Sequence, residues 1–407
     1  MGNIQAVAGL ITNTQKKYRF RLHGKNCVIV GQNGAGKTSL LNDLRNQLAS
    51  KIERSGAAHD ITNKKNILNQ LSHITSNPEN EEFYRNGIIT LRDNLKTSTG
   101  NCLIKFNYPM ELIEEFQNHT AIIKLFKADR KSDIKEVKSA LPFEKDTKNI
   151  YSSYNYGHDL EQHLVNMQVR AALSSQHDKT QKSFNKINAW LGEFNQNLKY
   201  LFEDESVEAV FYPGELRYYI HQEGKLPFGF QSLSSGYSAV FHIYAELLIK
   251  TEYHNLIPSE LRGIVLIDEI DAHLHISLQR KILPFFFRSF PNIQFIVTTH
   301  SPFVITSTDD SVIFDISKNR ASYDLSMYSL EAIVEGLLGV PVISKSLEDK
   351  LKHLLELTSL EEIPNEAVQI AKEISPYRDT MDSECRMHFE LALNKILKYK
   401  KSGAIDV

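Results

Sequence analysis

One segment of the sequence combines glycines, a lysine and a hydroxyl at a spacing that can hold phosphate. It runs from Gly31 to Thr38 and satisfies the pattern G-x-x-x-x-G-K-[ST]. Such a loop points backbone N–H groups at an anion, its lysine reaches the β- and γ-phosphates, and its hydroxyl ligates Mg²⁺. An ordinary glycine-rich turn is the alternative. We expect a nucleotide site formed by Gly31, Gln32, Asn33, Gly34, Ala35, Gly36, Lys37, Thr38 and Ser39.

Two carboxylates follow another apolar segment. Residues 264–267 are all apolar and lead directly into Asp268 and Glu269. This pattern is typical of a buried strand whose carboxyl end delivers charge to the edge of a sheet. Asp268 suits the coordination sphere of Mg²⁺ together with Thr38, and Glu269 suits a general base that deprotonates an attacking water. Alone, such a strand often simply exits into solvent, but beside a phosphate loop it predicts nucleotide hydrolysis.

The elements that must position these residues are predicted from hydrophobic periodicity. The apolar run 27–30 precedes the glycines, and leucines at helical spacing follow them, which indicates strand, turn and helix. Further strands are expected at 102–106, 122–126, 207–211, 217–221, 264–267 and 293–298, and a helix at 276–287. We therefore predict an α/β fold with a mixed β-sheet. The expected domains are an N-terminal lobe (1–150), a helical insertion (151–205), a C-terminal lobe (206–325) and a helical C-terminal region (326–407).

Composition excludes several classes of protein. The 47 Lys and Arg residues nearly balance 49 Asp and Glu residues, so any charged partner must be met by a local patch. The three cysteines lie far apart, which disfavours a disulfide framework and fits a reducing compartment. No apolar run approaches the roughly 20 residues needed to cross a bilayer. We expect a cytoplasmic protein without a membrane partner.

A further motif precedes the acidic strand. Residues 231–238 read QSLSSGYS ahead of an amphipathic stretch, and LSSGY resembles the signature motif of ABC-type ATPases. In that family the signature clamps the γ-phosphate of the nucleotide bound to the opposite subunit. The resemblance implies that Ser234, Ser235 and Gly236 act in trans, within a homodimer or higher homo-oligomer. Ser235 and Tyr237 depart from the commoner residues of the motif, and the serines also suit a helix N-cap.

The strand predicted at 293–298 leads to His300, which lies 31 residues (300 minus 269) after Glu269. It resembles the switch histidine of the same family, which contacts the γ-phosphate and the attacking water. Glu269 and His300 are therefore the candidate catalytic residues. The D-loop, which lies between these two residues, has His275 where SMC-like heads carry Asp. No glutamine loop is located, and Arg130 is interpreted either as a phosphate-side or interface residue or as a solvated strand end.

Taken together, these motifs resemble the SMC, RecF and OLD branch of ABC-type ATPases, and within it the small ATPases of bacterial antiphage systems. Among these ATPases, the sequence resembles AriA of the PARIS system slightly more than PtuA of Septu and retron systems. It implies an ATP- and Mg²⁺-dependent oligomeric sensor or scaffold that controls a separate toxic effector, of the Toprim or HNH nuclease class. A phage-encoded protein would be the trigger.

The residues after Ile313 lack the pattern of a nuclease of this branch. OLD nucleases need a Glu and a later Asp-x-Asp at strand ends to hold metal, whereas Asp379, Asp382 and Glu384 fall in a predicted helical region. We expect no nuclease domain in this chain, and the acidic helices 345–384 become a candidate docking surface for a basic partner.

Two rival functions use the same motifs. A DNA-repair ATPase of the RecF or SMC type would bind duplex DNA through the first fifty residues, where seven basic residues face one acidic residue. A transporter motor subunit is disfavoured by the helical insertion.

Overall fold

The computed structural model describes residues 2–12, 16–53, 102–130, 134–140, 156–177, 182–253, 256–339, 344–360, 362–381 and 383–401. These residues form two compact units, Met1–Met327 and Tyr328–Val407. The predicted boundary between residues 150 and 151 lies outside the described residues.

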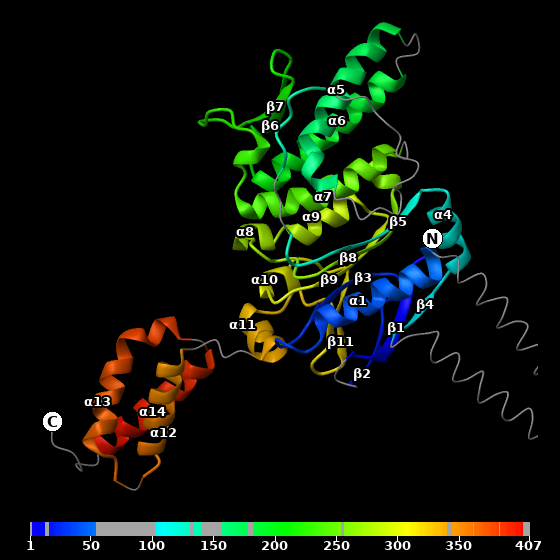
Figure 1. Cartoon of the computed structure of the whole chain (residues 1–407). Helices are drawn as coiled ribbons and strands as arrows, with labels where there is room; N and C mark the ends of the chain where they lie inside the picture. The colour runs from blue at the N-terminus through cyan, green and yellow to red at the C-terminus, as the bar shows by residue number, and fades with distance from the viewer. Residues whose placement is uncertain are drawn as a thin grey trace, which may run out of the picture. The chain divides into compact units, whose positions relative to one another are not determined.

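A six-stranded sheet forms the centre of the first unit (Figure 1). Its order is β11-β10-β3-β9-β8-β5, and only β11 runs antiparallel to its neighbour. The strands are β3 (Asn26–Val30), β5 (Ala121–Phe126), β8 (Arg262–Ile267), β9 (Ile293–Thr298), β10 (Ser311–Asp315) and β11 (Arg320–Tyr323). Parallel strands covered on both faces are expected to be mostly apolar. Strands β8 and β9 are mostly apolar, and every residue of both except Arg262 is buried. The predicted α/β fold with a mixed sheet is confirmed.

A smaller antiparallel sheet shares the core of this unit. Its order is β2-β1-β4, with β1 at Ile4–Leu10, β2 at Lys17–Arg21 and β4 at Cys102–Phe106. The inner face of this sheet packs with helix α1 (Lys37–Leu48) against one face of the central sheet. The ring of Phe20 stacks on that of Phe314 with centroids 4.1 Å apart. Helix α4 (Pro109–Gln117) and the π-helical turn η1 (Ala49–Glu53) extend the same layer.

Helices cover the opposite face of the central sheet. They are η3 (Tyr156–Asp159), α5 (Leu160–His177), α6 (Lys182–Phe202), η4 (Phe230–Ser232), α7 (Ser235–Tyr253), η5 (Pro258–Glu260), α8 (Ile276–Gln279), α9 (Ile282–Ser289) and α10 (Pro302–Ile305). Aromatic contacts join this layer to the sheet, for example Phe286 of α9 with Phe295 of β9 at 5.7 Å between centroids. The helices α5 and α6 lie side by side, next to a hairpin of β6 (Glu208–Tyr212) and β7 (Arg217–His221) (Figure 1).

The helix predicted at 276–287 is wrong as a single element, because the structure divides it into α8 and α9. The reason is Pro284, which lacks the N–H that would donate to the carbonyl of Arg280. The chain therefore restarts its helix at Ile282. Pro284 then lies in the first turn, where N–H groups have no helical partner in any case.

The second unit is helical. It consists of α11 (Leu330–Ile333), η6 (Val334–Leu338), α12 (Lys345–Leu357), α13 (Asn365–Ile374), η7 (Ser375–Thr380) and α14 (Ser383–Lys401). Apolar residues of α12, α13 and α14, among them Leu354 and Phe389, form its own core. No helix among the described residues of either unit is long and apolar enough to cross a membrane.

Several carboxylates of the predicted acidic docking surface already have basic neighbours. Glu373 lies 2.7 Å from Lys350, and Glu366 lies 3.1 Å from His353. Glu348 accepts a hydrogen bond from Lys352. Of the other acidic residues in this region, Glu361 and Asp382 lie outside the described residues. The surface therefore presents less unpaired negative charge than the composition suggested.

The close approach of β8 to β5 makes Gly263 a sensitive position. Its φ is +125°, and a Cβ atom there would lie 2.0 Å from the carbonyl oxygen of Ile122 on β5. Gly263→Ala should lower the free energy of unfolding by on the order of 3 kcal/mol, because strain and overpacking add. Urea denaturation followed by the fluorescence of Trp190, the chain's single tryptophan, measures the effect. Gly214→Ala, where a Cβ meets nothing within 4 Å, is the control, and equal destabilisation by both would contradict this account.

Candidate functional site

The phosphate-loop motif connects β3 to α1, as the sequence predicted. Gly36 caps α1 with a φ of +96°, and a Cβ there would lie 2.4 Å from a methyl group of Ile11, so the position requires glycine. The residues 32–34 at the middle of the loop are exposed, whereas Lys37 is only 7% exposed. The loop thus presents backbone to solvent at a helix N-terminus, where the helix dipole favours an anion.

The ammonium of Lys37 lies within the loop. Its Nζ donates to the carbonyl of Gly31 at 3.0 Å and to that of Gln32 at 3.1 Å. Burial lowers the pKa of Lys37, and the carboxylates of Glu269, Asp268 and Asp271 act in the opposite direction. The side chain of Lys37 therefore lies inside the loop, close to the acidic end of β8.

Thr38 and Asp268, the two predicted metal ligands, are brought together. The hydroxyl of Thr38 donates to Oδ2 of Asp268 at 2.8 Å, and the hydroxyl of Thr298 on β9 donates to Oδ1 at 2.6 Å. Asp268 is only 5% exposed. Carboxylate and hydroxyl oxygens are the hard donors that Mg²⁺ prefers, so these residues fit that ion.

Glu269 follows Asp268 in a left-handed conformation, with a φ of +45°. The backbone N–H of Glu269 donates to Oγ1 of Thr298 at 2.7 Å, and Glu269 is exposed. A left-handed non-glycine residue costs about 1–2 kcal/mol, so the surrounding hydrogen bonds must hold this peptide in place.

Arg130 supplies those bonds, which corrects its interpretation from the sequence. Its guanidinium donates from Nη1 to the carbonyl of Asp268 at 2.8 Å and from Nη2 to that of Glu269 at 2.9 Å. Burial lowers the pKa of Arg130, and nearby carboxylates act in the opposite direction. Arg130 is therefore not simply a solvated strand end, whereas its interpretation as a phosphate-side or interface residue stays a prediction. The only sequence signal for this role is its position four residues after the end of β5, the neighbour of β8.

The segment around His300 is held by hydroxyls. The hydroxyl of Thr299 donates to Oδ1 of Asp271 at 2.6 Å, and the N–H of Ser301 donates to Thr299 Oγ1 at 3.0 Å. The hydroxyl of Ser301 donates to Gln279 Oε1 at 2.6 Å. Burial and the charge of Lys37 lower the pKa of His300, which favours a neutral ring at pH 7. The sequence analysis missed Asp271, Thr298 and Thr299.

The signature residues form a second group at the start of α7. Ser234 and Ser235 are exposed, whereas Gly236 is buried. A Cβ on Gly236 would lie 3.1 Å from the carbonyl oxygen of His273, so α7 begins against the segment that follows Glu269. Among the described residues, no hydrogen bond or ion pair joins Ser234 or Ser235 to the phosphate loop of the same chain.

The D-loop position His275 caps α8, since its ring accepts from the N–H of Ser277 at 3.4 Å. Over the parts of the chain that the structure describes, no three His, Cys, Asp or Glu side chains converge on a metal site.

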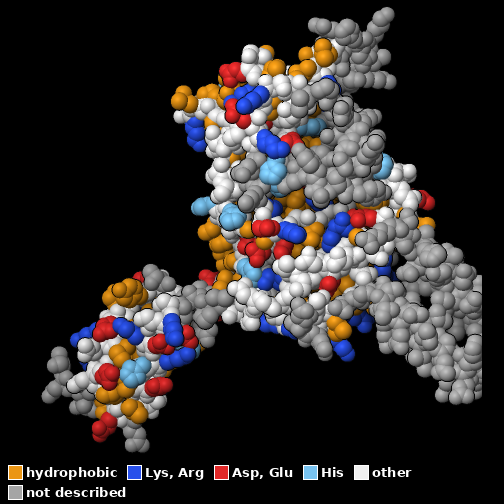
Figure 2. All heavy atoms as spheres, viewed as in Figure 1, with side chains coloured by type: hydrophobic (Ala, Val, Ile, Leu, Met, Phe, Trp, Pro, Cys, Tyr) orange, Lys and Arg blue, Asp and Glu red, His pale blue; other side chains and the backbone are white. Residues whose placement is uncertain are grey.

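A hollow of about 380 Å³ adjoins the acidic pair. Thr38, Asn42, Asp129, Asp268 and Glu269 are among the residues that line it. Figure 2 shows acidic, basic and histidine side chains gathered on this face of the first unit, near the position of α10 in Figure 1. The volume of the hollow is within the range of small-molecule sites.

Comparison with known families gives one match over more than half of the chain. The family is described as "AAA domain, putative AbiEii toxin, Type IV TA system", and its model matches residues 69–306. This range includes the signature motif, the acidic pair and His300, and it begins after the phosphate loop.

Curated relatives match over shorter stretches. The retron Ec83 probable ATPase of Escherichia coli is 36% identical over 135 residues, which cover 30% of this chain and 24% of that protein. The Septu protein PtuA of Bacillus mycoides is 34% identical over 114 residues, which cover 26% of this chain and 16% of that protein. The chain thus spans less than a quarter of the length of either relative. The resemblance to AriA stays a prediction.

Among solved structures, the SMC head domain from Thermotoga maritima is similar to this chain with a TM-score of 0.36 and 12% sequence identity. The match covers 79% of this chain and 97% of that one.

The bonds of Arg130 predict a separation of binding from turnover. Arg130→Lys should lower the rate of nucleotide hydrolysis roughly 10- to 100-fold, because the forked contact to the Asp268 and Glu269 carbonyls is lost. Nucleotide affinity should change little, since Arg130 does not touch the phosphate loop. Steady-state kinetics and direct binding measure both, with the exposed Arg288→Lys as control. A loss of affinity with an unchanged rate constant would be the opposite of this expectation.

Proposed function

This chain belongs to the AAA domain family, and on that premise we propose that it binds ATP with Mg²⁺ and hydrolyses it to ADP and phosphate. One observation carries the proposal. Thr38 of the phosphate loop and Asp268 of the acidic strand, 230 positions apart in the chain, are joined by a hydrogen bond of 2.8 Å. That contact unites a phosphate-binding loop with a carboxylate suited to Mg²⁺.

Each site residue has a proposed role. The N–H groups of the loop and the ammonium of Lys37 bind the phosphates, while Thr38 and Asp268 hold Mg²⁺, which supplies charge neutralisation when bound. Glu269 accepts the proton of the attacking water, and its exposed position leaves room for that water. His300 contacts the same water or the γ-phosphate as a neutral hydrogen-bonding group.

We further propose that the site is completed by a second copy of the chain. The exposed Ser234 and Ser235 at the N-terminus of α7 would meet the nucleotide bound by the partner, as the signature motif implies. Gly236 supports this arrangement, because its contact with the segment after Glu269 couples the trans surface to the cis site.

The biological role we propose is that of a cytoplasmic sensor or scaffold in bacterial antiphage defence. The relatives named as a retron ATPase and a Septu protein support this setting. A separate effector of the Toprim or HNH nuclease class would be held or released in response to a phage-encoded trigger. Residues 1–150 and 206–325 would form the two ATPase lobes, and residues 151–205 the helical insertion between them. Residues 326–407 would form the region that docks the partner.

One observation favours a second candidate, binding of duplex DNA. On the outer face of the β2-β1-β4 sheet, Lys17, Arg19 and Arg21 of β2 are exposed, as is Lys105 of β4. The register places Ala6 and Ala8 of β1 between these strands. Neighbouring cations on one strand lie about 7 Å apart, since alternate residues share a face. This face, which has no carboxylate on its three strands, suits a phosphate backbone.

Two substitutions test the ATPase. Lys37→Ala should weaken ATP binding by roughly 100-fold or more, because charged hydrogen bonds to phosphate are lost. Glu269→Gln should retain ATP binding but slow hydrolysis by about 10²–10⁴-fold, since the general base is removed. Lys350→Ala on the second unit is the matched control. Hydrolysis by the Glu269→Gln protein at the parent rate would show that Glu269 is not the base.

Retention of DNA separates the two candidates. Binding through the β2 face should be lost between about 50 and 200 mM salt, and Arg19→Glu should abolish it at the lower concentration, while Lys350→Glu should not. A gel-shift series with a duplex of defined length, with and without ATP, is the measurement. The absence of any retention would exclude this candidate and leave the scaffold.

A further inference from the structure

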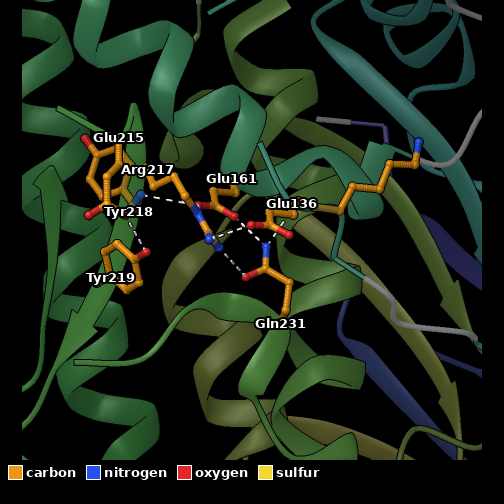
Figure 3. Close-up of polar contacts among 8 residues, drawn as sticks. Glu136, Glu161, Glu215, Arg217, Tyr218, Tyr219 and Gln231 are labelled. Atoms are coloured by element: carbon orange, nitrogen blue, oxygen red, sulfur yellow. Dashed lines mark hydrogen bonds and ion pairs between the residues drawn. The ribbon is translucent and has the colours of Figure 1, made fainter. Parts of the chain in front are cut away.

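A buried carboxylate lies beneath the segment that leads to the signature residues. Glu161, at the start of α5, is 0% exposed. It is surrounded by Arg217 of β7 and Gln231 of η4, with Glu136 at the edge (Figure 3). We call these four side chains the Glu161 network. It joins three elements that are far apart in the sequence.

The side chains of Glu161, Arg217 and Gln231 are hydrogen-bonded to one another. Arg217 donates from Nε to Glu161 at 3.3 Å, from Nη1 to Glu136 at 2.6 Å and from Nη2 to Gln231 at 3.0 Å. Gln231 donates from Nε2 to Oε2 of Glu161 and to the carbonyl of Lys135 at 3.2 Å. The N–H of Tyr218 also donates to Glu161, at 3.3 Å. Glu161 therefore fixes the rotamers of both of its neighbours.

Such a network is not explained by stability alone. Removing a carboxylate and a guanidinium from water costs free energy, and apolar residues of similar size often stabilise a protein as well or better. What a satisfied buried network supplies is one fixed geometry. Here that geometry is imposed on one segment of the chain.

The segment is the turn before the signature. Gln231 lies in η4, three positions (234 minus 231) before Ser234. A Cβ on the preceding Gly229 would lie 2.6 Å from Oε1 of Gln231, so the amide of Gln231 packs closely on the backbone of this turn. Phe230 in the same turn is buried and lies 6.2 Å from the ring of Phe194 on α6. Both helices of the insertion thus hold this turn, α5 through a charge and α6 through an aromatic ring.

We propose that Glu161 is a positioning residue for the trans site. It holds the turn at Gln231 so that Ser234, Ser235 and Gly236 meet the nucleotide of a second copy. This inference rests on the proposed function, since it assigns a cause to the geometry of the signature residues. It also gives the α5–α6 pair a role in dimer formation without any contact to the nucleotide.

The test uses the full chain in the Glu269→Gln background, where ATP-bound dimers should accumulate. Adding Glu161→Gln should leave ATP binding by the protomer within about twofold, because the phosphate loop is untouched, and raise the dimer dissociation constant about tenfold or more. Light-scattering mass against concentration measures the dimer, and a fluorescent ATP analogue measures binding. Glu215→Gln is the matched control, because that carboxylate contacts only the hydroxyl of Tyr219 in Figure 3.

A fold defect is separated from a positioning effect by a second variant. Glu161→Gln with Arg217→Gln removes the buried charge pair and leaves only Glu136 without its partner, and that side chain is 56% exposed and can be hydrated. The unfolding midpoint of the double variant should therefore recover while its dimer remains weak. Parent-like dimerisation by Glu161→Gln would overturn the inference while the proposed function stands. Failure of the Glu269→Gln protein itself to dimerise with ATP would refute the trans site, and the inference with it.

Discussion

The carboxylate of Asp268 is the point on which the rest of the site depends. Hydroxyls from α1 and β9 donate to its two oxygens, so the phosphate loop, the acidic strand and the strand before His300 meet at one side chain. This convergence needs parallel strands in the order β3-β9-β8, because only then do their carboxyl ends reach the same edge. The apolar cores on both faces of the sheet stabilise that strand order.

Strain and burial are concentrated around the same point. Glu269 occupies a left-handed conformation that Arg130 and Thr298 hold through backbone atoms. Lys37 and His300, with pKa values lowered by burial, lie near three carboxylates. The signature segment is linked to the acidic pair by the close packing of Gly236 on His273. A structural change at the nucleotide would therefore be transmitted to the exposed surface of α7.

The sequence predicted the features that depend on local pattern. The loop at Gly31–Thr38, the apolar strand before Asp268 and the strand before His300 are each encoded by neighbouring residues, and the structure has a strand or helix at each. Long-range contacts gave no such signal. Arg130 meets Glu269 across 139 positions and Arg217 meets Glu161 across 56, so only the fold reveals these partners. The break between α8 and α9 was visible at Pro284, but helical periodicity on both sides concealed it. Thr298 looked like an ordinary strand residue because its hydroxyl acts through its neighbour on β8.

The central claim is that each nucleotide is held by two copies of the chain, and complementation tests it most directly. A Lys37→Ala protein has a defective phosphate loop and an intact signature, whereas a Ser234→Arg protein has the reverse. Each should be inactive alone. In a mixed dimer one composite site is intact, so mixing equal amounts should restore about a quarter of the parent ATPase activity, because half of the dimers are mixed and each has one of two sites. No recovery on mixing, although the two proteins form mixed dimers, would contradict the account.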